Sequence, residues 1–208
     1  EEESSKIYLQ AKAGNQVSLE YILAVSEVPD AKVTDITGTD GYDYIQLSDA
    51  MTGITINAKA DHDYIYGGSS DNIIYGGAGN DEIDIHGNNN IIYGGKGNDY
   101  MYSGGMYEEE MDHSVKTSNT YVFNTGDGKD TIRVWSSDIT LKFADATSLN
   151  SFNYERLGDD LIIKYTNSDS VCIRDYFYEN EDEYEDEYEY EEESSKIYLQ
   201  AKAGNQVS

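Results

Sequence analysis

Aspartate and asparagine side chains recur every nine residues in the most regular part of the chain. Residues 58–102 divide without a gap into AKADHDYIY, GGSSDNIIY, GGAGNDEID, IHGNNNIIY and GGKGNDYMY. The sixth position always carries a side-chain oxygen, and its members are Asp63, Asn72, Asp81, Asn90 and Asp99. Asp43 takes the same place in the earlier unit GTDGYDYIQ (38–46). Rows of such oxygens are suited to a hard divalent cation.

Glycine accompanies these oxygens at the first, second and fourth positions of the two most regular units. These glycines include Gly77, Gly79, Gly95 and Gly97. Glycine permits a tight or left-handed turn and lets carbonyl oxygens approach a ligand closely. Calcium prefers carboxylate and carbonyl oxygens, about six to eight of them. Without a cation, stacked Asp rows would repel one another. The alternative is a calcium-free solenoid held by Asn and Asp turns, but the joint recurrence of Asp and Gly favours calcium.

The eighth position of each unit supplies the apolar residue that must position these loops. Its members are Ile65, Ile74, Ile83, Ile92 and Met101, and the spacing continues backwards to Ile56, Ile45 and Ile36 if two residues are inserted within 47–57. A run of three extended residues, positions 7 to 9, points its middle side chain to one face. The pattern therefore predicts an all-β fold whose narrow core lies between two sheets.

The units GGAGNDEID and GGKGNDYMY resemble the nonapeptide of RTX (repeat-in-toxin) proteins, Gly-Gly-x-Gly-x-Asp-x-apolar-x. The resemblance implies a parallel β-roll or β-solenoid with two nonapeptides per turn and several Ca²⁺ ions between turns. It also implies that alternate loops stack on one edge. The ligands it implies are the Asp edge (Asp43, Asp63, Asp81, Asp99) and the carbonyls around the four glycines named above.

Asn72 and Asn90 are implied to lie on the opposite edge, where they depart from the family pattern. Neutral amides bind calcium more weakly, so these two residues are either weaker ligands or members of hydrogen-bonded Asn ladders.

The resemblance extends towards the C-terminus. Residues 118–132 are similar to the final strand-forming repeats of such rolls, with Asp127 and Asp130 as further ligands. Residues 157–177 are similar to the β-rich segment that commonly closes RTX arrays.

The predicted organisation has six parts. These are an N-terminal β segment or cap (1–32), a calcium-binding β-roll (33–102, with nonapeptides 38–46 and 58–102), an acidic insertion (103–118), final roll repeats with a β-rich cap (119–178), an acidic Tyr-rich linker (179–193), and the start of the next identical repeat (194–208). The last assignment rests on residues 191–208, which repeat residues 1–18 letter for letter. Such identity indicates either tandem modules with a 190-residue period or a duplicated end, and we favour the tandem modules.

Composition narrows the function further. The 208 residues carry 14 Lys+Arg against 41 Asp+Glu, a net charge of −27, which argues against a nucleic-acid partner because phosphate recognition needs clustered cationic side chains. Neither a membrane span nor a leader is visible, so the chain is expected to be mature or a fragment. Three scattered histidines, His62, His86 and His113, show no metal spacing, and we expect no enzyme activity. Cys172 is expected to be a buried, inert thiol, and the alternative for an odd Cys in an exported protein is pairing between molecules.

Two surfaces are predicted to make contacts. Ile73, Tyr75, Ile91 and Tyr93 form an apolar outer face, which we expect to be covered either by residues 1–25 or 103–118 or by a neighbouring module. The acidic run 175–193 is either a solubilising linker or a strand that docks on the next module once its charge is screened.

The sequence as a whole predicts an extracellular, calcium-stabilised structural module without catalytic activity. It would fold on export into calcium-rich medium and be repeated in tandem or polymerised into a surface filament or adhesin stalk. Its partners would be copies of itself, and a glycan or surface ligand is not defined. The alternative is the calcium-binding secretion and folding region of a larger secreted RTX enzyme or toxin.

Overall fold

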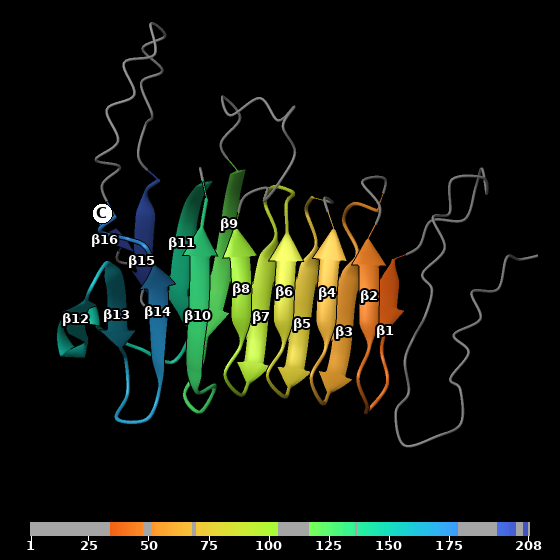
Figure 1. Cartoon of the computed structure of the whole chain (residues 1–208), viewed down its shortest axis with the longest axis horizontal. Coiled ribbons are helices and arrows are strands. Elements are labelled where there is room, and N and C mark those ends of the chain that lie inside the picture. Colours follow the sequence, from red (N-terminus) through yellow and green to blue (C-terminus); the bar gives the residue numbers. More distant parts are fainter. Residues whose placement is uncertain are drawn as a thin grey trace, which may run out of the picture.

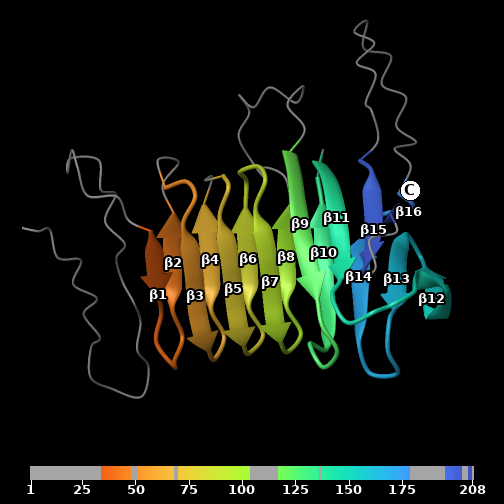
Figure 2. The same cartoon turned by 180° about the vertical axis from the view of Figure 1, so that it is seen from behind.

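In the part of the chain that the computed structural model describes, two eight-stranded sheets stack face to face (Figures 1 and 2). The structure describes residues 34–47, 51–67, 70–103, 117–135, 137–178, 195–202 and 206–207. Between Asp35 and Phe143 the chain alternates between the sheets, one strand in each per turn, and neighbouring strands within a sheet run parallel. This is the predicted parallel β-roll.

The strands of sheet A, in spatial order, are β1 (Asp35–Thr37), β3 (Thr55–Ala60), β5 (Ile73–Ala78), β7 (Ile91–Lys96), β9 (Thr117–Phe123), β11 (Ser137–Phe143), β15 (Ile197–Ala201) and β16 (Gln206–Val207). Those of sheet B are β2 (Tyr44–Leu47), β4 (Tyr64–Gly67), β6 (Glu82–Ile85), β8 (Tyr100–Ser103), β10 (Lys129–Val134), β14 (Ser170–Arg174), β13 (Asp160–Lys164) and β12 (Asn153–Leu157). One short 3₁₀ helix, η1 (Leu149–Ser151), precedes β12. None of the helices in the described ranges has the length and apolar character needed to cross a bilayer.

The register of the strands follows the nonapeptide period. Ile74 pairs with Ile92 in sheet A, and Ile65 pairs with Ile83 in sheet B, two units further along the chain in each case. The first turn is longer, because Ile45 pairs with Ile65. That longer step confirms the two residues predicted to be inserted within 47–57.

The eighth-position residues form the core between the sheets. Those from Ile45 to Met101 are at most 1% exposed, and Ile36 packs against them from the end of the roll. The predicted run of three extended residues is too short for sheet A, whose strands β3, β5 and β7 have six residues. The strands continue into the glycines because Gly77 pairs with Gly95 and extends the parallel ladder.

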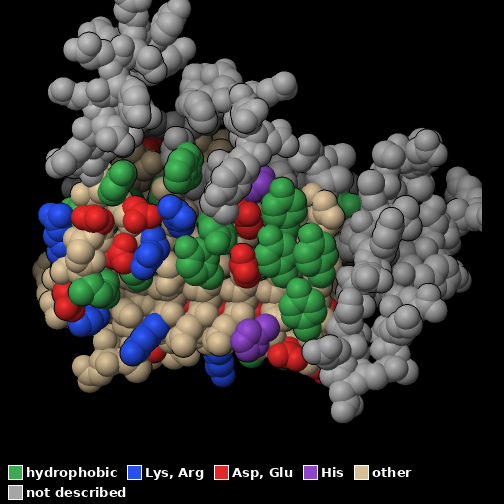
Figure 3. Space-filling model, in the orientation of Figure 1, with side chains coloured by type: hydrophobic (Ala, Val, Ile, Leu, Met, Phe, Trp, Pro, Cys, Tyr) green, Lys and Arg blue, Asp and Glu red, His purple; other side chains and the backbone are tan. Residues whose placement is uncertain are grey.

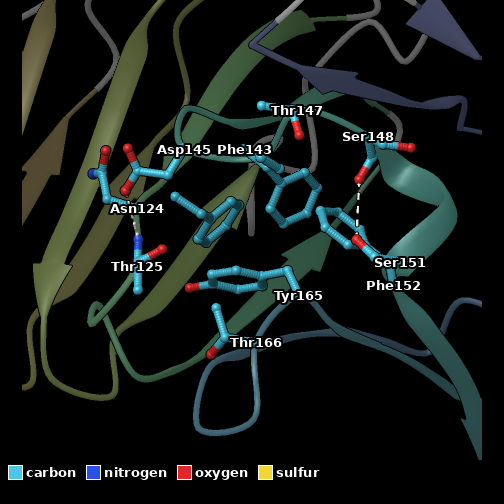
Figure 4. A pocket seen from close by; sticks show the side chains of 12 residues that line it. Asn124, Thr125, Phe143, Asp145, Thr147, Ser148, Ser151, Phe152, Tyr165 and Thr166 are labelled. Carbon is cyan, nitrogen blue, oxygen red and sulfur yellow. Dashed lines mark hydrogen bonds between the residues drawn. The ribbon is translucent and has the colours of Figure 1, made fainter.

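The C-terminal end of the roll is closed by aromatic side chains and antiparallel strands. Phe123, Phe143, Phe152 and Tyr165 pack together, with the Phe143 and Phe152 ring centroids 4.7 Å apart. They line a cavity of about 210 Å³ (Figure 4). Strands β12, β13 and β14 form an antiparallel extension of sheet B. Strand β12 was not among the sequence predictions, because NYERL is exposed along its whole length and has no apolar periodicity.

Several predicted parts lie outside the described residues. These are the N-terminal β segment (1–32), nearly all of the acidic insertion (103–118) and the acidic linker (179–193). The insertion does not interrupt the roll, since Ile91 of β7 pairs directly with Thr120 of β9.

Candidate calcium site

One edge of the roll carries a ladder of buried aspartates. The backbone N–H of Asp63 donates to Asp81 Oδ1 at 2.9 Å, and that of Asp81 donates to Asp99 Oδ1 at 2.8 Å. The same contact joins Asp43 to Asp63 at one end and Asp99 to Asp130 at the other. All five side chains are at most 3% exposed. The turns of the roll thus position one carboxylate per turn, as the resemblance implied.

The second oxygen of three ladder carboxylates has no hydrogen-bond donor. Oδ2 of Asp63, Asp81 and Asp99 is buried without a partner. A buried carboxylate oxygen that is neither paired nor hydrogen-bonded is strongly unfavourable. Asp43 differs, because Thr39 supplies its backbone N–H to Oδ2 and its hydroxyl to Oδ1. The row of Oδ2 atoms without donors therefore begins at Asp63. Sequence spacing alone does not distinguish Asp43 from the later aspartates of the ladder.

Burial raises the pKa of the ladder carboxyls well above the ordinary 3.8. It raises the pKa of Asp63 and of Asp99 to about 7 and that of Asp81 to about 6, and the backbone donor on Oδ1 offsets only part of this effect. Burial raises the pKa of Asp130 furthest, to about 8. Protein groups alone therefore do not stabilise the charged form of this row.

Glycines in the loops next to the ladder let backbone carbonyls pack closely. Gly77 and Gly95 have φ of +117° and +108°, and Gly79 and Gly97 have +149° and +139°. A Cβ on Gly95 would clash with the Gly77 carbonyl oxygen, and one on Gly97 would clash with that of Gly79. A Cβ on Gly76 would lie 2.5 Å from both Asp81 Oδ2 and the Gly94 carbonyl oxygen. Oδ2 of Asp81 thus lies on the same side of the loop as the Gly94 carbonyl oxygen of the next turn.

The loop 58–63 keeps this geometry without its glycines. Lys59 and Asp61 stand where the later loops have Gly77 and Gly79, and both have positive φ, +83° and +79°. Such a backbone costs about 1 to 3 kcal/mol for a non-glycine residue, so it persists only because the stacked turns hold it.

The donor set of this edge consists of oxygen alone. The described residues contain no group of three or more His, Cys, Asp or Glu side chains that could hold a metal by themselves. A cation here must take one carboxylate per turn and complete its shell with carbonyls, which is the mixture that calcium accepts. The unsatisfied Oδ2 atoms and the glycine-lined carbonyls fit that ion.

Comparison with protein families matches the part of the chain that contains Asp63, Asp81 and Asp99. Residues 55–83 and 87–105 match the RTX calcium-binding nonapeptide repeat in four copies. This segment consists of RTX repeats. RTX repeats bind Ca²⁺, and domains made of them are structural calcium-binding modules. Comparison with curated proteins found no match.

The opposite edge of the RTX repeats carries an asparagine ladder. The N–H of Asn72 donates to Asn90 Oδ1 at 2.9 Å, and the N–H of Asn90 donates to Asn119 Oδ1 at 2.9 Å. Asn119 Nδ2 in turn donates to the Gly87 carbonyl at 3.0 Å. The ladder predicted as one alternative for Asn72 and Asn90 is therefore present, and their Oδ1 atoms already accept N–H groups.

Sequence reasoning missed several members of these ladders. Asn119 continues the asparagine row after the insertion, where the nine-residue count is lost. Asn80 and Asn98 form a second, exposed row on the Asp edge, because the Asn98 N–H donates to Asn80 Oδ1. Their recurrence at the fifth position of GGAGND and GGKGND was the available signal.

The two aspartates predicted beyond the insertion have different places. Asp130 completes the Asp ladder, as described above. Asp127 is also buried, but its Oδ2 accepts the backbone N–H of Asn124 at 2.6 Å and closes that turn. Its main-chain carbonyl accepts the Gly97 N–H, so the final RTX repeat is joined to the turn that follows it.

The predicted contact face on sheet A is present in part. Tyr75 and Tyr93 stack with ring centroids 4.7 Å apart. Tyr75 is 37% and Ile91 38% exposed, while Ile73 and Tyr93 are half-buried. Cover by a neighbouring module stays a prediction.

The outer face of sheet B is more mixed than that of sheet A. Hydrophobic side chains flank acidic ones there (Figure 3). Glu82 pairs with Tyr64 on one side and Tyr100 on the other. Asp84 is not a free surface acid, since it is 5% exposed and lies 2.9 Å from His86 Nε2.

Replacing Gly97 by Ala should destabilise the calcium site. The new Cβ would clash with the Gly79 carbonyl oxygen. Residue 97 also has φ of +139°, and for a non-glycine residue this backbone strain should lower the free energy of unfolding by about 1 to 3 kcal/mol in addition to the effect of the clash. Urea unfolding in saturating calcium measures the loss. Gly126→Ala is the control, because Gly126 has φ of +93° but open space around its Cβ position. Equal losses in the two variants would contradict a role for the stacked carbonyls.

Proposed function

We propose that this chain is a calcium-gated structural module of an extracellular protein, repeated or polymerised into a surface filament or adhesin stalk. RTX calcium-binding repeats indicate a calcium-binding module, and proteins that carry them are typically secreted. The observation that carries the proposal is the row of buried Oδ2 atoms of Asp63, Asp81 and Asp99 without donors.

The aspartate ladder is the gating element. Folding removes these carboxylates from water and stacks them one turn apart, which costs free energy through both desolvation and repulsion. A bound Ca²⁺ supplies the positive charge that offsets both. Asp63, Asp81 and Asp99 would each hold such an ion through Oδ2, one carboxylate per turn, and the carbonyls of Gly77, Gly79, Gly95 and Gly97 would complete the shells of these ions.

This arrangement links folding to location. Ligand that binds only the folded state stabilises it by about 2.7 kcal/mol per site at a hundredfold excess over Kd. The low calcium inside a cell leaves the chain unfolded and exportable, whereas millimolar calcium outside the cell favours the roll.

Thermal unfolding with and without calcium tests the proposal. We expect the melting temperature of the whole chain to fall sharply when EGTA replaces millimolar calcium, and to recover when calcium is restored. Magnesium is the control, because it demands a smaller, octahedral shell and should stabilise much less. A melting curve unchanged by excess chelator would rule out calcium gating.

The duplicated 18 residues favour the structural role over a folding region of a larger enzyme or toxin. An exact copy of residues 1–18 at 191–208 is expected of tandem modules with a 190-residue period. The full reading frame separates the two functions: many near-identical repeats favour a fibre, and one copy beside a catalytic or pore-forming region favours the carrier. Electron microscopy of native material with and without calcium tests the filament itself.

A further inference from the structure

The last parallel strand of sheet A comes from the duplicated segment. Strand β15 pairs with β11 over five residues, from Ile139↔Ile197 to Phe143↔Ala201. Figures 1 and 2 show it closing sheet A beside β11, far from it in sequence. The antiparallel β16 then pairs with β15. Both strands lie within residues 191–208.

The contacts of β15 are specific and include the core. Ala201 is 3% exposed, and Ile197 and Leu199 pack against the hydrophobic core. The main chain is fixed at both ends of the strand. The Lys196 N–H donates to Asp138 Oδ1 at 2.9 Å, and the Lys202 N–H donates to the Ala146 carbonyl at 2.8 Å. Ser195 Oγ accepts the Ser137 N–H at 3.1 Å.

On the β15 side of these contacts, every residue has an identical counterpart 190 positions earlier. Ser195 to Lys202 reads SKIYLQAK, and so does 5–12. The chain therefore contains two equivalent donor segments, whereas β11 is the one strand in the described ranges that accepts β15 in parallel. An edge strand that can be completed by an identical element of another molecule is a low-cost route to assembly.

We propose that residues 5–12 of a second copy of this chain can replace β15 on β11, so that copies join by strand exchange. This inference rests on the proposed structural function and names its interface. Because the contacts are the same in both arrangements, the segment of the same chain has the advantage of high effective concentration. Exchange between chains becomes dominant when that internal segment is disabled. In a tandem array, the strand that completes one module is the opening segment of the next module.

Matched substitutions in the two copies of the strand test the exchange in the whole chain. We introduce Ile197→Asp and Leu199→Asp in one variant, Ile7→Asp and Leu9→Asp in a second, and all four in a third. The first should associate head to tail, with a sedimentation mass at least twice that of the monomer and rising with concentration. The second and third should stay monomeric, the third with a lower melting temperature than the second.

A peptide with the sequence of residues 5–12 provides the rescue. It should restore the melting temperature of the fourfold variant, whereas the same peptide with Asp at both apolar positions should not. The proposal is overturned if the first variant stays monomeric, whether or not its melting temperature changes. It is also overturned if the fourfold variant associates as strongly as the first.

The same samples separate this proposal from calcium gating. Each variant is melted in calcium and in EGTA. A calcium response without association of the first variant leaves the calcium module intact and removes only the strand exchange. Association of the first variant without a calcium response supports the strand exchange and removes calcium gating.

Discussion

Asp81→Asn should stabilise the calcium-free protein and destabilise the calcium-bound one. Asn keeps an Oδ1 that can accept the Asp63 N–H. The substitution removes the buried Asp81 carboxylate, whose pKa burial raises to about 6. Its Nδ2 would lie beside the Gly94 carbonyl, where a donor is favourable. In calcium, the variant should lose the contribution of the affected site, about 2.7 kcal/mol at a hundredfold excess over Kd. Melting both proteins in calcium and in EGTA measures the two effects.

Asn90→Asp on the opposite edge is the matched control. Asn90 Nδ2 lies 3.2 Å from Asn119 Oδ1, so a carboxylate oxygen in that place would face another oxygen and repel it. We expect it to lower the melting temperature in EGTA, and calcium should not restore the loss. Restoration by calcium would show that the Asn edge, too, is built for the ion. An Asp81→Asn variant with an unchanged calcium response would show that the Asp ladder does not hold it.

Mild acid should replace calcium as a stabiliser. The pKa values of Asp63, Asp81, Asp99 and Asp130 are all raised on folding, so the folded chain binds more protons than the unfolded chain between about pH 4 and pH 8. Their contribution to stability is full below the unfolded value near 3.8 and is lost as the pH rises through the folded values of about 6 to 8. The melting temperature in EGTA should therefore be higher at pH 5 than at pH 8.

The lowered pKa of Asp169 does not change that window. Thr166, Ser168 and the Gly126 N–H donate to this carboxylate and outweigh its burial, and the stability it supplies is lost only below its ordinary 3.8. Calcium must displace protons from the ladder, so its affinity should rise between pH 6 and pH 8, with proton release measurable by calorimetry in two buffers. A melting temperature in EGTA that rises with pH would contradict this assignment.

The periodic features of the fold could be predicted from the sequence because each turn repeats the last. The eighth-position apolar residues lie in the core, and the sixth-position residues form ladders on separate edges. Features that depend on residues outside the period could not be predicted. Thr39 satisfies Asp43 from within its own loop, and no spacing rule identifies this. The pairing of β15 with β11 joins residues 58 positions apart, across the acidic run.

The C-terminal closure of the roll has a consequence for the order of folding. Each turn contacts only its neighbours, so the roll is close to a one-dimensional system. The antiparallel strands β12 to β14 and the contact between Phe143 and Phe152 join residues that are closer in sequence than those of neighbouring turns, so structure can begin there. We expect turns to be added from there towards β1, against the direction of synthesis. A defect near β1 therefore affects only the last turn, whereas one near β10 separates every earlier turn from its starting point.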